Sequence, residues 1–235
     1  MVAHHCAKYS DAFLPILANI LKGCKRVLDF NAGVCKIVRI RDYGFAGQII
    51  CIEIEAPWAE GGRDEECLTL VCNAEHMPLL DGYCDGAAVS VTYGNRLSDH
   101  HNAKDGSRRH GYKFGLGRDL TTGNTGEMSF TGKRKASLRY CTSYKRQYME
   151  LYRVLAAGKL LVLNISDHIR KQRIRKGKTR KQMRVHTTLW HRLCLQSLGF
   201  ELVEEIKIET PRLRYGANAK ARVPYESILV FKRGE

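Results

Sequence analysis

Short apolar runs alternate along the chain with segments in which apolar residues recur at helical spacing. Most of the runs are four to seven residues long and rich in Ile, Leu and Val, which is typical of strands buried in a sheet. The intervening segments predict helices, the first of which Ser10 or Asp11 is placed to cap. The predicted strands are residues 26–30, 48–53, 68–72, 87–90, 159–165, 201–210 and 227–232, and the predicted helices are 12–21, 34–41, 138–155 and 185–198.

The alternation of strands and helices predicts an α/β, Rossmann-like fold, with a mostly parallel sheet that carries helices on both faces. The last two predicted strands are joined without a helix, which indicates one antiparallel strand at the end of the chain. Two polar, basic stretches at about 94–137 and 167–184 interrupt the pattern. We therefore expect a single domain over residues 1–235 that contains two insertions.

Charge is unevenly distributed along the chain. Residues 1–93 hold 8 Lys/Arg and 12 Asp/Glu, whereas residues 94–235 hold 31 and 12, within a formal net charge of +15. A dense positive charge beside long loops predicts contact with a polyanion such as nucleic acid. The first part of the chain is then suited to a neutral or cationic small molecule.

Several other classes of protein do not fit the sequence. No apolar run approaches the roughly 20 residues of a membrane span, and the polar residues 1–10 do not predict a secretory leader. Nine cysteines without a CxxC pair predict reduced thiols in a cytoplasmic protein. His100, His101, His186 and His191 lack the spacing of four convergent ligands, so no metal site is expected.

Polar residues stand where the first four predicted strands end: Asp29, Glu53, Asn73 and Ser90. Ligands of open α/β sheets bind beyond the carboxyl ends of the strands, so these residues predict a site. Glu53 follows Asp29 by 24 residues, a spacing at which an acid can accept hydrogen bonds from a ribose. From spacing alone, a nucleoside-type cofactor and simple helix caps are both open interpretations.

Two stretches carry a resemblance to a known family. Residues 27–35, Val-Leu-Asp-Phe-Asn-Ala-Gly-Val-Cys, look like the motif VLDPFAGxG, and residues 90–93, Ser-Val-Thr-Tyr, resemble the serine form of the motif (S/D/N)PPY. Both motifs belong to DNA methyltransferases that act on exocyclic amino groups. Cys35 stands where the family has glycine, and Val91 and Thr92 stand where it has prolines. Further strings that resemble a phage and actinobacterial branch of the family are residues 93–101, 164–170, 190–191 and 214–218.

The resemblance implies a class I methyltransferase fold, with a seven-stranded sheet, and S-adenosylmethionine as cofactor. Glu53 would hold the ribose hydroxyls of that cofactor, with Glu55 as the alternative, and the glycine turn would border its methionine end. The cofactor-binding residues that the resemblance implies are Lys8, Tyr9, Ser10, Asp11, Phe13, Asp29, Asn31, Ala32, Gly33, Glu53, Asn73, Ala74 and Ser90.

The resemblance also implies a reaction. The Ser90 hydroxyl and the Val91 carbonyl would accept the hydrogens of an exocyclic amino group, and Tyr93 would stack on a base flipped out of duplex DNA. Serine at the first motif position leans toward cytosine N4 over adenine N6. Methylation at cytosine C5 needs a cysteine nucleophile, typically after proline, and no proline in this chain precedes a cysteine.

The two basic insertions would take the place of a separate target-recognition domain. A catalytically inactive DNA-binding relative, an adenine N6 enzyme and an RNA methyltransferase remain alternatives, and a homodimer is possible. Pairing with Asp99, Asp105 or Asp119 is the structural alternative for Arg96, Arg108, Arg109 and Arg118. The expected nucleic-acid contacts are Asn95, Arg96, Arg108, Arg109, Arg118, Arg170, Lys171, Arg173, Arg175, Lys176, Lys178, Arg180, Lys181, Arg212, Arg214 and Asn218.

Overall fold

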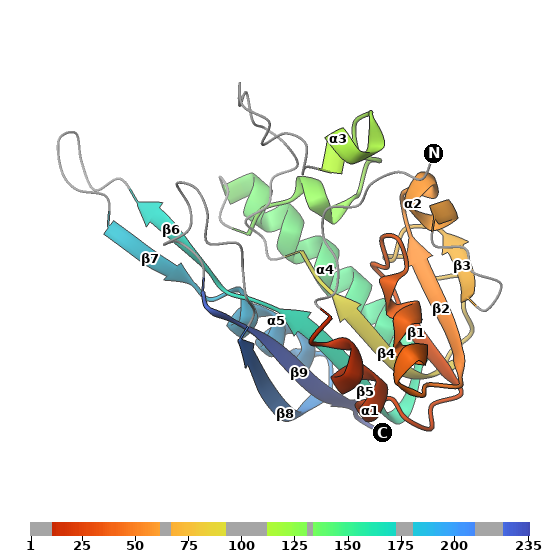
Figure 1. Cartoon of the computed structure of the whole chain (residues 1–235). Helices are drawn as coiled ribbons and strands as arrows, with labels where there is room; N and C mark the ends of the chain where they lie inside the picture. Colours follow the sequence, from red (N-terminus) through yellow and green to blue (C-terminus); the bar gives the residue numbers. More distant parts are fainter. Residues whose placement is uncertain (1–10, 62–66, 93–111, 131–133, 173–180, 210–222) are drawn as a thin grey trace.

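One twisted sheet runs through the centre of the computed structural model (Figure 1). The structure describes residues 11–61, 67–92, 112–130, 134–172, 181–209 and 223–235. Its helices are α1 (Leu14–Ile20), α2 (Ala56–Gly61), α3 (Tyr112–Leu116), α4 (Arg134–Val154) and α5 (Thr187–Ser197), with the 3-10 helices η1 (Lys36–Tyr43) and η3 (Thr125–Glu127). Its strands are β1 (Arg26–Asp29), β2 (Gln48–Glu53), β3 (Cys67–Val71), β4 (Cys84–Ser90), β5 (Leu155–Ile165), β6 (His168–Gln172), β7 (Lys181–Val185), β8 (Phe200–Glu209) and β9 (Tyr225–Arg233).

Seven of the strands form the main sheet, in the order β3-β2-β1-β4-β5-β9-β8. Strands β1 to β5 pair in parallel, and β9 lies antiparallel between β5 and β8. This arrangement confirms the predicted Rossmann-like sheet with its antiparallel terminal strand. Each parallel step crosses over a helix or a long connection, as the alternating sequence pattern requires.

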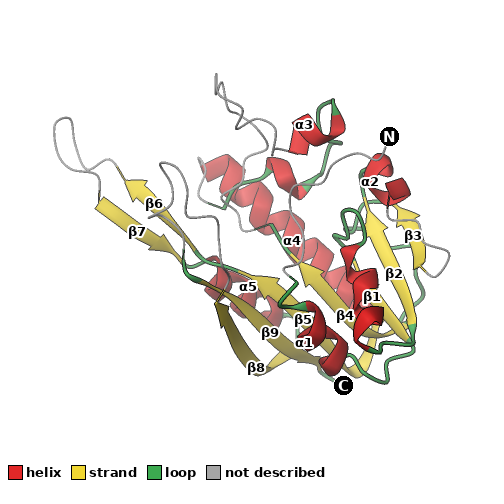
Figure 2. Ribbon diagram, in the orientation of Figure 1, coloured by secondary structure: helices red, strands yellow, loops and turns green. Residues whose placement is uncertain are grey.

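Helices cover both faces of the sheet, and neighbouring strand residues point to opposite cores. Val27 packs with α1 and η1, whereas Leu28 packs with α4 and α5. Figure 2 shows α1 in front of the sheet and α4 and α5 behind it. The core on the α4 side contains three fully buried tyrosines, Tyr140, Tyr144 and Tyr148. Buried phenols need hydrogen-bond partners: Tyr140 and Tyr144 bind Thr92, which follows β4, and Tyr148 binds His191 of α5.

The first helix begins later than the sequence predicts. Its N-cap is Phe13, which makes no side-chain cap and is fully buried in the α1 core. Pro15 occupies the first turn, where a missing N–H costs nothing. Asp11, expected as a cap, binds instead Lys36 Nζ at 2.7 Å and Arg39 Nη1 at 2.9 Å. These ion pairs join the start of the described chain to η1.

The insertion predicted at 167–184 contains two strands that the sequence does not reveal. β6 and β7 form an antiparallel hairpin apart from the main sheet, and Figure 1 shows it projecting beyond one end of that sheet. A hairpin that projects from the sheet needs no apolar alternation, so a basic sequence can form one through its backbone alone. In the other insertion, the described residues form α3, η3 and the start of α4. The segment predicted as a helix over 34–41 is a 3-10 helix.

None of the helices in the described residues combines the length and the apolar character needed to cross a membrane.

Candidate active site

The carboxyl ends of three neighbouring strands meet at one edge of the sheet. Because β1 lies between β2 and β4 and pairs with both in parallel, Asp29, Glu53 and Ser90 reach the same edge (Figure 1). We call these three residues, with the chain that follows each, the carboxyl edge. The structure thus brings together the strand-end residues that the sequence singled out.

Glu53 fastens the glycine turn after β1 to the end of β2. Its Oε2 accepts from the Gly33 N–H at 2.7 Å, and its Oε1 accepts from the Glu55 N–H at 2.9 Å. Gly33 has φ +56°, a conformation that favours glycine and that the turn requires. The Glu53 side chain is buried, and burial raises its pKa to about 7 despite these backbone donors. The carboxyl therefore changes charge near neutral pH.

Glu55, the alternative to Glu53, has a different role. It is fully buried and accepts four hydrogen bonds from the segment that follows α3. Its Oε1 accepts from the Thr121 N–H at 2.7 Å and from Asn124 Nδ2 at 2.9 Å. Its Oε2 accepts from the Thr121 hydroxyl at 3.0 Å and from Arg118 Nη2 at 2.7 Å. These partners occupy both oxygens, so Glu53 is the better ribose acceptor of the two.

Arg118, an expected nucleic-acid contact, is half-exposed and pairs with Glu55. Its Nη1 also donates to the Asp119 carbonyl at 2.8 Å. The Asp119 carboxylate, expected as a partner, binds Lys113 Nζ instead, at 2.6 Å. Arg118 therefore makes an ion pair within the protein, as the structural alternative predicted. Its partner is not one of the three expected aspartates but Glu55, which the sequence offered as an alternative acceptor for the ribose hydroxyls.

Asp29 is fully buried at the end of β1, and its Oδ1 accepts from the Asn31 N–H at 3.3 Å. The Asn31 side chain turns toward α4, where its Nδ2 donates to Gln147 Oε1 at 3.0 Å. Ala32 is also buried, and its N–H donates to the Ile52 carbonyl at 3.1 Å. The predicted cofactor turn is thus fixed on both sides, by β2 and by α4.

The turn after β3 is fixed in a similar way. Asn73 Oδ1 accepts from the Glu75 N–H at 3.0 Å, and Glu75 Oε1 accepts from the Ser143 hydroxyl of α4 at 2.6 Å. Ala74 between them is buried. Asn73 and Ala74 therefore lie in an ordered turn at the carboxyl end of the sheet, as the sequence predicts.

The Ser90 hydroxyl is oriented by the neighbouring strand. Its Oγ donates to Asn164 Oδ1 at 3.1 Å, and Asn164 Nδ2 donates to Glu226 Oε2 at 3.4 Å. The Val91 N–H donates to the Asn164 carbonyl at 3.3 Å. Because the hydroxyl proton is directed at Asn164, the lone pairs of Ser90 Oγ can accept from another donor. Ser90 is half-buried, whereas the Val91 side chain is buried.

Two buried tyrosines of α4 hold Thr92. The Thr92 N–H donates to the Tyr144 hydroxyl at 2.9 Å, and the Thr92 hydroxyl lies 2.9 Å from the same oxygen. The Tyr140 hydroxyl donates to the Thr92 carbonyl at 2.6 Å. We call this set of contacts the tyrosine clamp. The third motif position is therefore held at its N–H, its carbonyl and its side chain.

His191 of α5 supports the clamp from behind. Its Nε2 lies 2.9 Å from the Tyr140 hydroxyl, and its Nδ1 bonds the Tyr148 hydroxyl. Burial lowers the pKa of His191 to about 3, so the ring is neutral. Since Tyr140 donates to Thr92, it accepts from Nε2–H, and Nδ1 accepts from Tyr148. The sequence predicted that His191 packs beside Trp190, and their rings are 4.8 Å apart.

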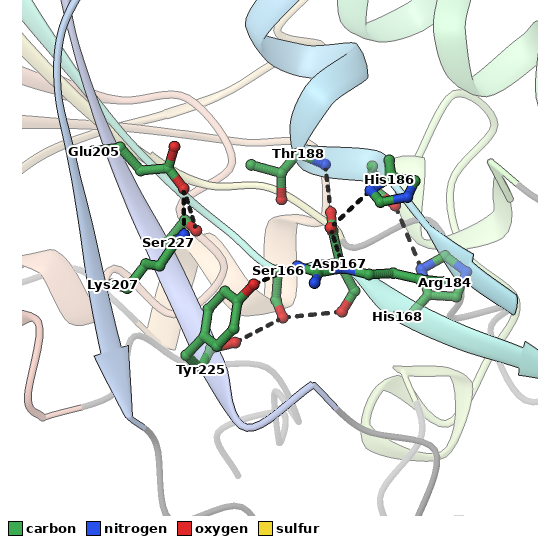
Figure 3. Close-up of polar contacts among 11 residues, drawn as sticks. Ser166, Asp167, His168, Arg184, His186, Thr188, Glu205, Lys207, Tyr225 and Ser227 are labelled. Carbon is green, nitrogen blue, oxygen red and sulfur yellow. Dashed lines mark hydrogen bonds and ion pairs between the residues drawn. The ribbon is translucent and has the colours of Figure 1, made fainter.

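The basic hairpin is anchored just after β5 ends, at Asp167, three residues beyond Asn164. Figure 3 shows Asp167 at the centre of this anchor, between the hairpin and the start of α5. Asp167 Oδ2 accepts from Arg184 Nε at 2.9 Å, and Oδ1 accepts from the Thr188 N–H at 2.9 Å. Arg184 also donates to the Tyr225 hydroxyl. These contacts fix the base of the hairpin beside the carboxyl edge.

For the remaining predicted cofactor-binding and nucleic-acid-binding residues, the structure describes no side chain. Strands β6 and β7 contain Arg170, Lys171 and Lys181, for which the structure describes the backbone alone. The residues that lie outside the described ranges are Lys8, Tyr9, Ser10, Tyr93, Asn95, Arg96, Arg108, Arg109, Arg173, Arg175, Lys176, Lys178, Arg180, Arg212, Arg214 and Asn218.

Sequence reasoning missed the residues that orient the carboxyl edge from a distance. Asn164 is a polar residue at the end of a very apolar strand, and that contrast was the available signal. The tyrosines of the clamp recur every four residues, which a sequence reader takes as ordinary core spacing.

A group of three cysteines was also missed, because its members stand 16 residues apart in sequence: Cys35, Cys51 and Cys67. Their Sγ atoms all lie within 4.8 Å of one another. Hydrogen bonding with Cys35 and Cys51 lowers the pKa of the Cys67 thiol. The same contacts, together with burial, raise the pKa of the Cys51 thiol.

No family model matches the chain, and no curated protein matches it. Among solved structures, it is similar to an S-adenosylmethionine-dependent methyltransferase from Methanosarcina mazei, at 13% identity over 94% of this chain and 97% of that one, with a TM-score of 0.56. It is also similar to 1,6-didemethyltoxoflavin-N1-methyltransferase from Burkholderia thailandensis, solved with S-adenosylhomocysteine (13% identity, 96% and 78% coverage, TM-score 0.53). A third similar structure is the [4+2]-cyclase SpnF (14% identity, 95% and 80% coverage, TM-score 0.58).

Identities at this level show a shared fold. The presence of a cyclase among the similar structures means that the reaction has to be argued from the site. The strand order and these similarities agree on the architecture: the chain has the class I methyltransferase fold.

Proposed function

We propose that this chain is an S-adenosylmethionine-dependent methyltransferase that acts on an exocyclic amino group in DNA, with cytosine N4 as the favoured acceptor. The observation that carries the proposal is the oriented Ser90 hydroxyl. It lies at the end of a central strand and directs its proton to Asn164, 3.1 Å away. A hydroxyl held in this way is an acceptor for a donor at the carboxyl edge, and an amino group is such a donor.

The glycine turn and Glu53 fit the proposed cofactor. A ribose presents two hydroxyl donors, and a carboxylate already held by two backbone N–H groups accepts them without rearrangement. Hydroxyl donors favour the charged carboxylate and so offset the burial that raises the Glu53 pKa to about 7. Glu53 is the residue that we assign to the ribose.

The proposed reaction needs an amino nitrogen with an available lone pair. The lone pair of an exocyclic amino group is delocalised into the base, and two acceptors that bind its hydrogens draw the nitrogen toward tetrahedral geometry. We assign these roles to the Ser90 hydroxyl and the Val91 carbonyl. When bound, S-adenosylmethionine would supply an electrophilic methyl group to that nitrogen, with S-adenosylhomocysteine as the leaving group. The methylated nitrogen then releases one proton to water.

The tyrosine clamp favours an enzyme over an inactive DNA-binding relative. The family motif uses prolines to fix the backbone that carries the acceptor carbonyl, and this chain has Val91 and Thr92 there. In the structure, contacts to Tyr140 and Tyr144 fix Thr92 instead. Positioning is the main contribution that such a site makes to the rate, so a fixed backbone supports catalysis.

Charge supports nucleic acid as the substrate. Residues 94–235 hold 31 Lys/Arg against 12 Asp/Glu, and the basic hairpin stands on the Asp167 anchor beside the carboxyl edge. Phosphate contacts of this kind position a duplex, and the target base must then leave the stack to reach Ser90. The serine of the motif is the feature that favours cytosine N4 over adenine N6.

The test is incubation of the purified protein with S-adenosylmethionine labelled in its methyl group and mixed-sequence duplex DNA. Label should enter the DNA, and mass spectrometry of the digested nucleosides should identify N4-methylcytosine. A Ser90→Ala protein prepared in parallel controls for a contaminating methyltransferase. Label in RNA alone, or binding of cofactor and DNA without transfer, would overturn the proposal. N6-methyladenine would keep the enzyme and correct the base.

A further inference from the structure

Three cysteines from separate segments converge on the α1 face of the sheet. Cys35 follows the glycine turn, Cys51 lies in β2, and Cys67 begins β3. The Sγ atoms of Cys51 and Cys67 are 3.3 Å apart, and the three Sγ atoms lie within 4.8 Å of one another. The hydroxyl of Thr69 is a neighbour, 3.7 Å from the sulfur of Cys67. Cys35 follows the glycine turn of the carboxyl edge, but none of the three thiols is assigned a part in the proposed reaction.

The backbone of Cys35 adopts a conformation that side chains rarely take. Its φ is +53° and its ψ is +37°, and it is the one non-glycine residue with positive φ in the described ranges. Strain of this kind persists where the surrounding structure fixes it, and it gathers at functional sites. A glycine, which the resembling motif has at this position, would relieve the strain but supply no sulfur. Here the strained backbone carries a thiol that joins the other two.

Access and surroundings suit a bound ion. Cys35 and Cys51 are buried, whereas Cys67 is half-buried on β3, the edge strand of the sheet. The sulfurs therefore lie in a largely buried site, and the charged groups that act on them are Asp29 and Arg41. Apolar surroundings strengthen the attraction between a cation and thiolates.

The distances between the sulfurs match the ligand-to-ligand distance around a soft cation. A metal–sulfur distance of about 2.3 Å places the ligands of a tetrahedral site about 3.8 Å apart. The separations here, from 3.3 Å to at most 4.8 Å, bracket that value. Thiolates select Zn²⁺ and Cu⁺ over hard cations such as Mg²⁺ and Ca²⁺.

We propose that Cys35, Cys51 and Cys67 form a three-thiolate binding site for a thiophilic d¹⁰ cation, Zn²⁺ or Cu⁺. Each thiol releases a proton when the ion binds, so affinity falls at acid pH. The site joins the turn after β1 to β2 and β3, and the bound ion would cross-link three segments that hydrogen bonds and apolar packing otherwise connect.

The test uses the reduced full-length protein after removal of metals with a chelator. Titration with Cd²⁺ should produce a sulfur-to-cadmium charge-transfer absorption that saturates at one ion per chain. Competition with a chromophoric chelator then gives the Zn²⁺ affinity, and anaerobic titration with a Cu⁺ probe gives the affinity for Cu⁺. The two affinities, compared with those of the cysteine variants, show which ion depends on all three sulfurs. X-ray absorption of the loaded protein should show three sulfur neighbours at about 2.3 Å.

Cys35→Gly is the decisive variant, because glycine suits the left-handed backbone and the protein should fold. Its Zn²⁺ affinity should fall at least about 100-fold, as should that of Cys67→Ser. Cys24→Ser is the matched half-buried control and Cys84→Ser the buried one, and both should bind as the parent does. Equal losses in the controls, fewer than three sulfur neighbours, or no charge-transfer absorption in a folded, reduced protein would overturn the proposal. So would a Cys51–Cys67 disulfide that forms in a protein whose reduced form binds no metal.

Discussion

Two halves of the carboxyl edge are built in different ways. In the first half, Glu53 binds backbone N–H groups of residues 2 and 20 positions away, Glu55 and Gly33. In the second half, Ser90 and Thr92 depend on side chains 74 and 52 positions away, Asn164 and Tyr144. The first half forms a site from neighbouring turns. The second forms one only after α4 and β5 have packed.

This difference separates binding from chemistry. The half assigned to the cofactor is close to the family motif in sequence, and its glycine turn is held chiefly by Glu53 of β2, with a further contact from Asn31 to Gln147 of α4. The half assigned to the target base departs from the motif, and distant side chains hold it. Mutations of the distant side chains should therefore affect turnover while leaving cofactor affinity unchanged.

The largest effect should come from Ser90→Ala. The change removes an acceptor for the amino group without altering the charge of the surface, so kcat should fall about 100-fold or more. The dissociation constant for DNA should stay within about twofold. Single-turnover methyl transfer and DNA binding measure the two quantities, and Ser197→Ala on the surface of α5 is the control. Equal losses in rate and in DNA affinity would contradict the role of Ser90 as an acceptor for the amino group.

A smaller effect should follow from neutralising Arg173, Arg175, Lys176 and Lys178 together. Each phosphate that the protein no longer neutralises reduces the slope of log affinity against log salt by about 0.9, and DNA affinity at low salt should fall at least about tenfold. Cofactor affinity should not change. The control neutralises Lys22 and Lys25, exposed residues before β1 at the opposite end of the strands. An unchanged salt slope in the four-residue variant would place the DNA elsewhere.

Glu53 should make cofactor affinity depend on pH. Only the ionised carboxylate accepts both ribose hydroxyls, and its pKa is raised to about 7. Affinity for S-adenosylmethionine should therefore rise about tenfold between about pH 6 and about pH 8. Glu53→Gln should bind more weakly and show no such rise. Calorimetry across this range measures both, and a flat profile in the parent protein would contradict the assignment.

The same group predicts a stability change in the protein without ligand. The Glu53 pKa is raised from 4.5 to about 7, so the folded state retains a proton that the unfolded chain releases. The stabilisation is complete below pH 4.5 and is lost as the pH rises through about 7. In Glu53→Gln, the free energy of unfolding should fall less over this range. Denaturant titrations of the two proteins at several pH values provide the comparison.

The smallest effect should come from Tyr144→Phe, which removes the hydroxyl that holds Thr92. We expect kcat to fall about fivefold with cofactor affinity unchanged, and stability to fall by about 1 kcal/mol. Adding Thr92→Pro should restore part of the rate, because proline stiffens the backbone and has no N–H to satisfy. A Tyr152→Phe control tests an α4 tyrosine outside the clamp. If the rate falls only as far as the loss of stability explains, and proline does not restore it, then Tyr144 serves only to stabilise the core.

Sequence reasoning predicted the sheet, the strand-end residues and the turn near Gly33, because each depends on local pattern. Strands β1, β2 and β4 are apolar runs that end in polar residues, and a parallel sheet brings such ends together. The hairpin of β6 and β7 could not be predicted in this way, since its sequence shows no alternation of apolar and polar residues.

The contacts that orient Ser90 and Thr92 lay beyond prediction for a different reason. They join residues more than 50 positions apart, and no single segment shows the pairing. Tyr144 has the spacing of a core residue, and only the packed structure shows that its hydroxyl reaches Thr92. Cys35, Cys51 and Cys67 belong to the same class, because their convergence follows from strand order and from one unusual backbone angle.

The tyrosine clamp changes what a sequence signature for such enzymes has to contain. When phenols on a helix distant in sequence fix the backbone beside the acceptor serine, the side chains of that backbone can vary while its geometry is kept. A search that requires two prolines after the serine passes over such a chain. A search for tyrosines at four-residue intervals, as in Tyr140, Tyr144 and Tyr148, followed downstream by a Trp-His pair, would recover it. Such a search would also show how many other chains hold this backbone with tyrosines in place of prolines.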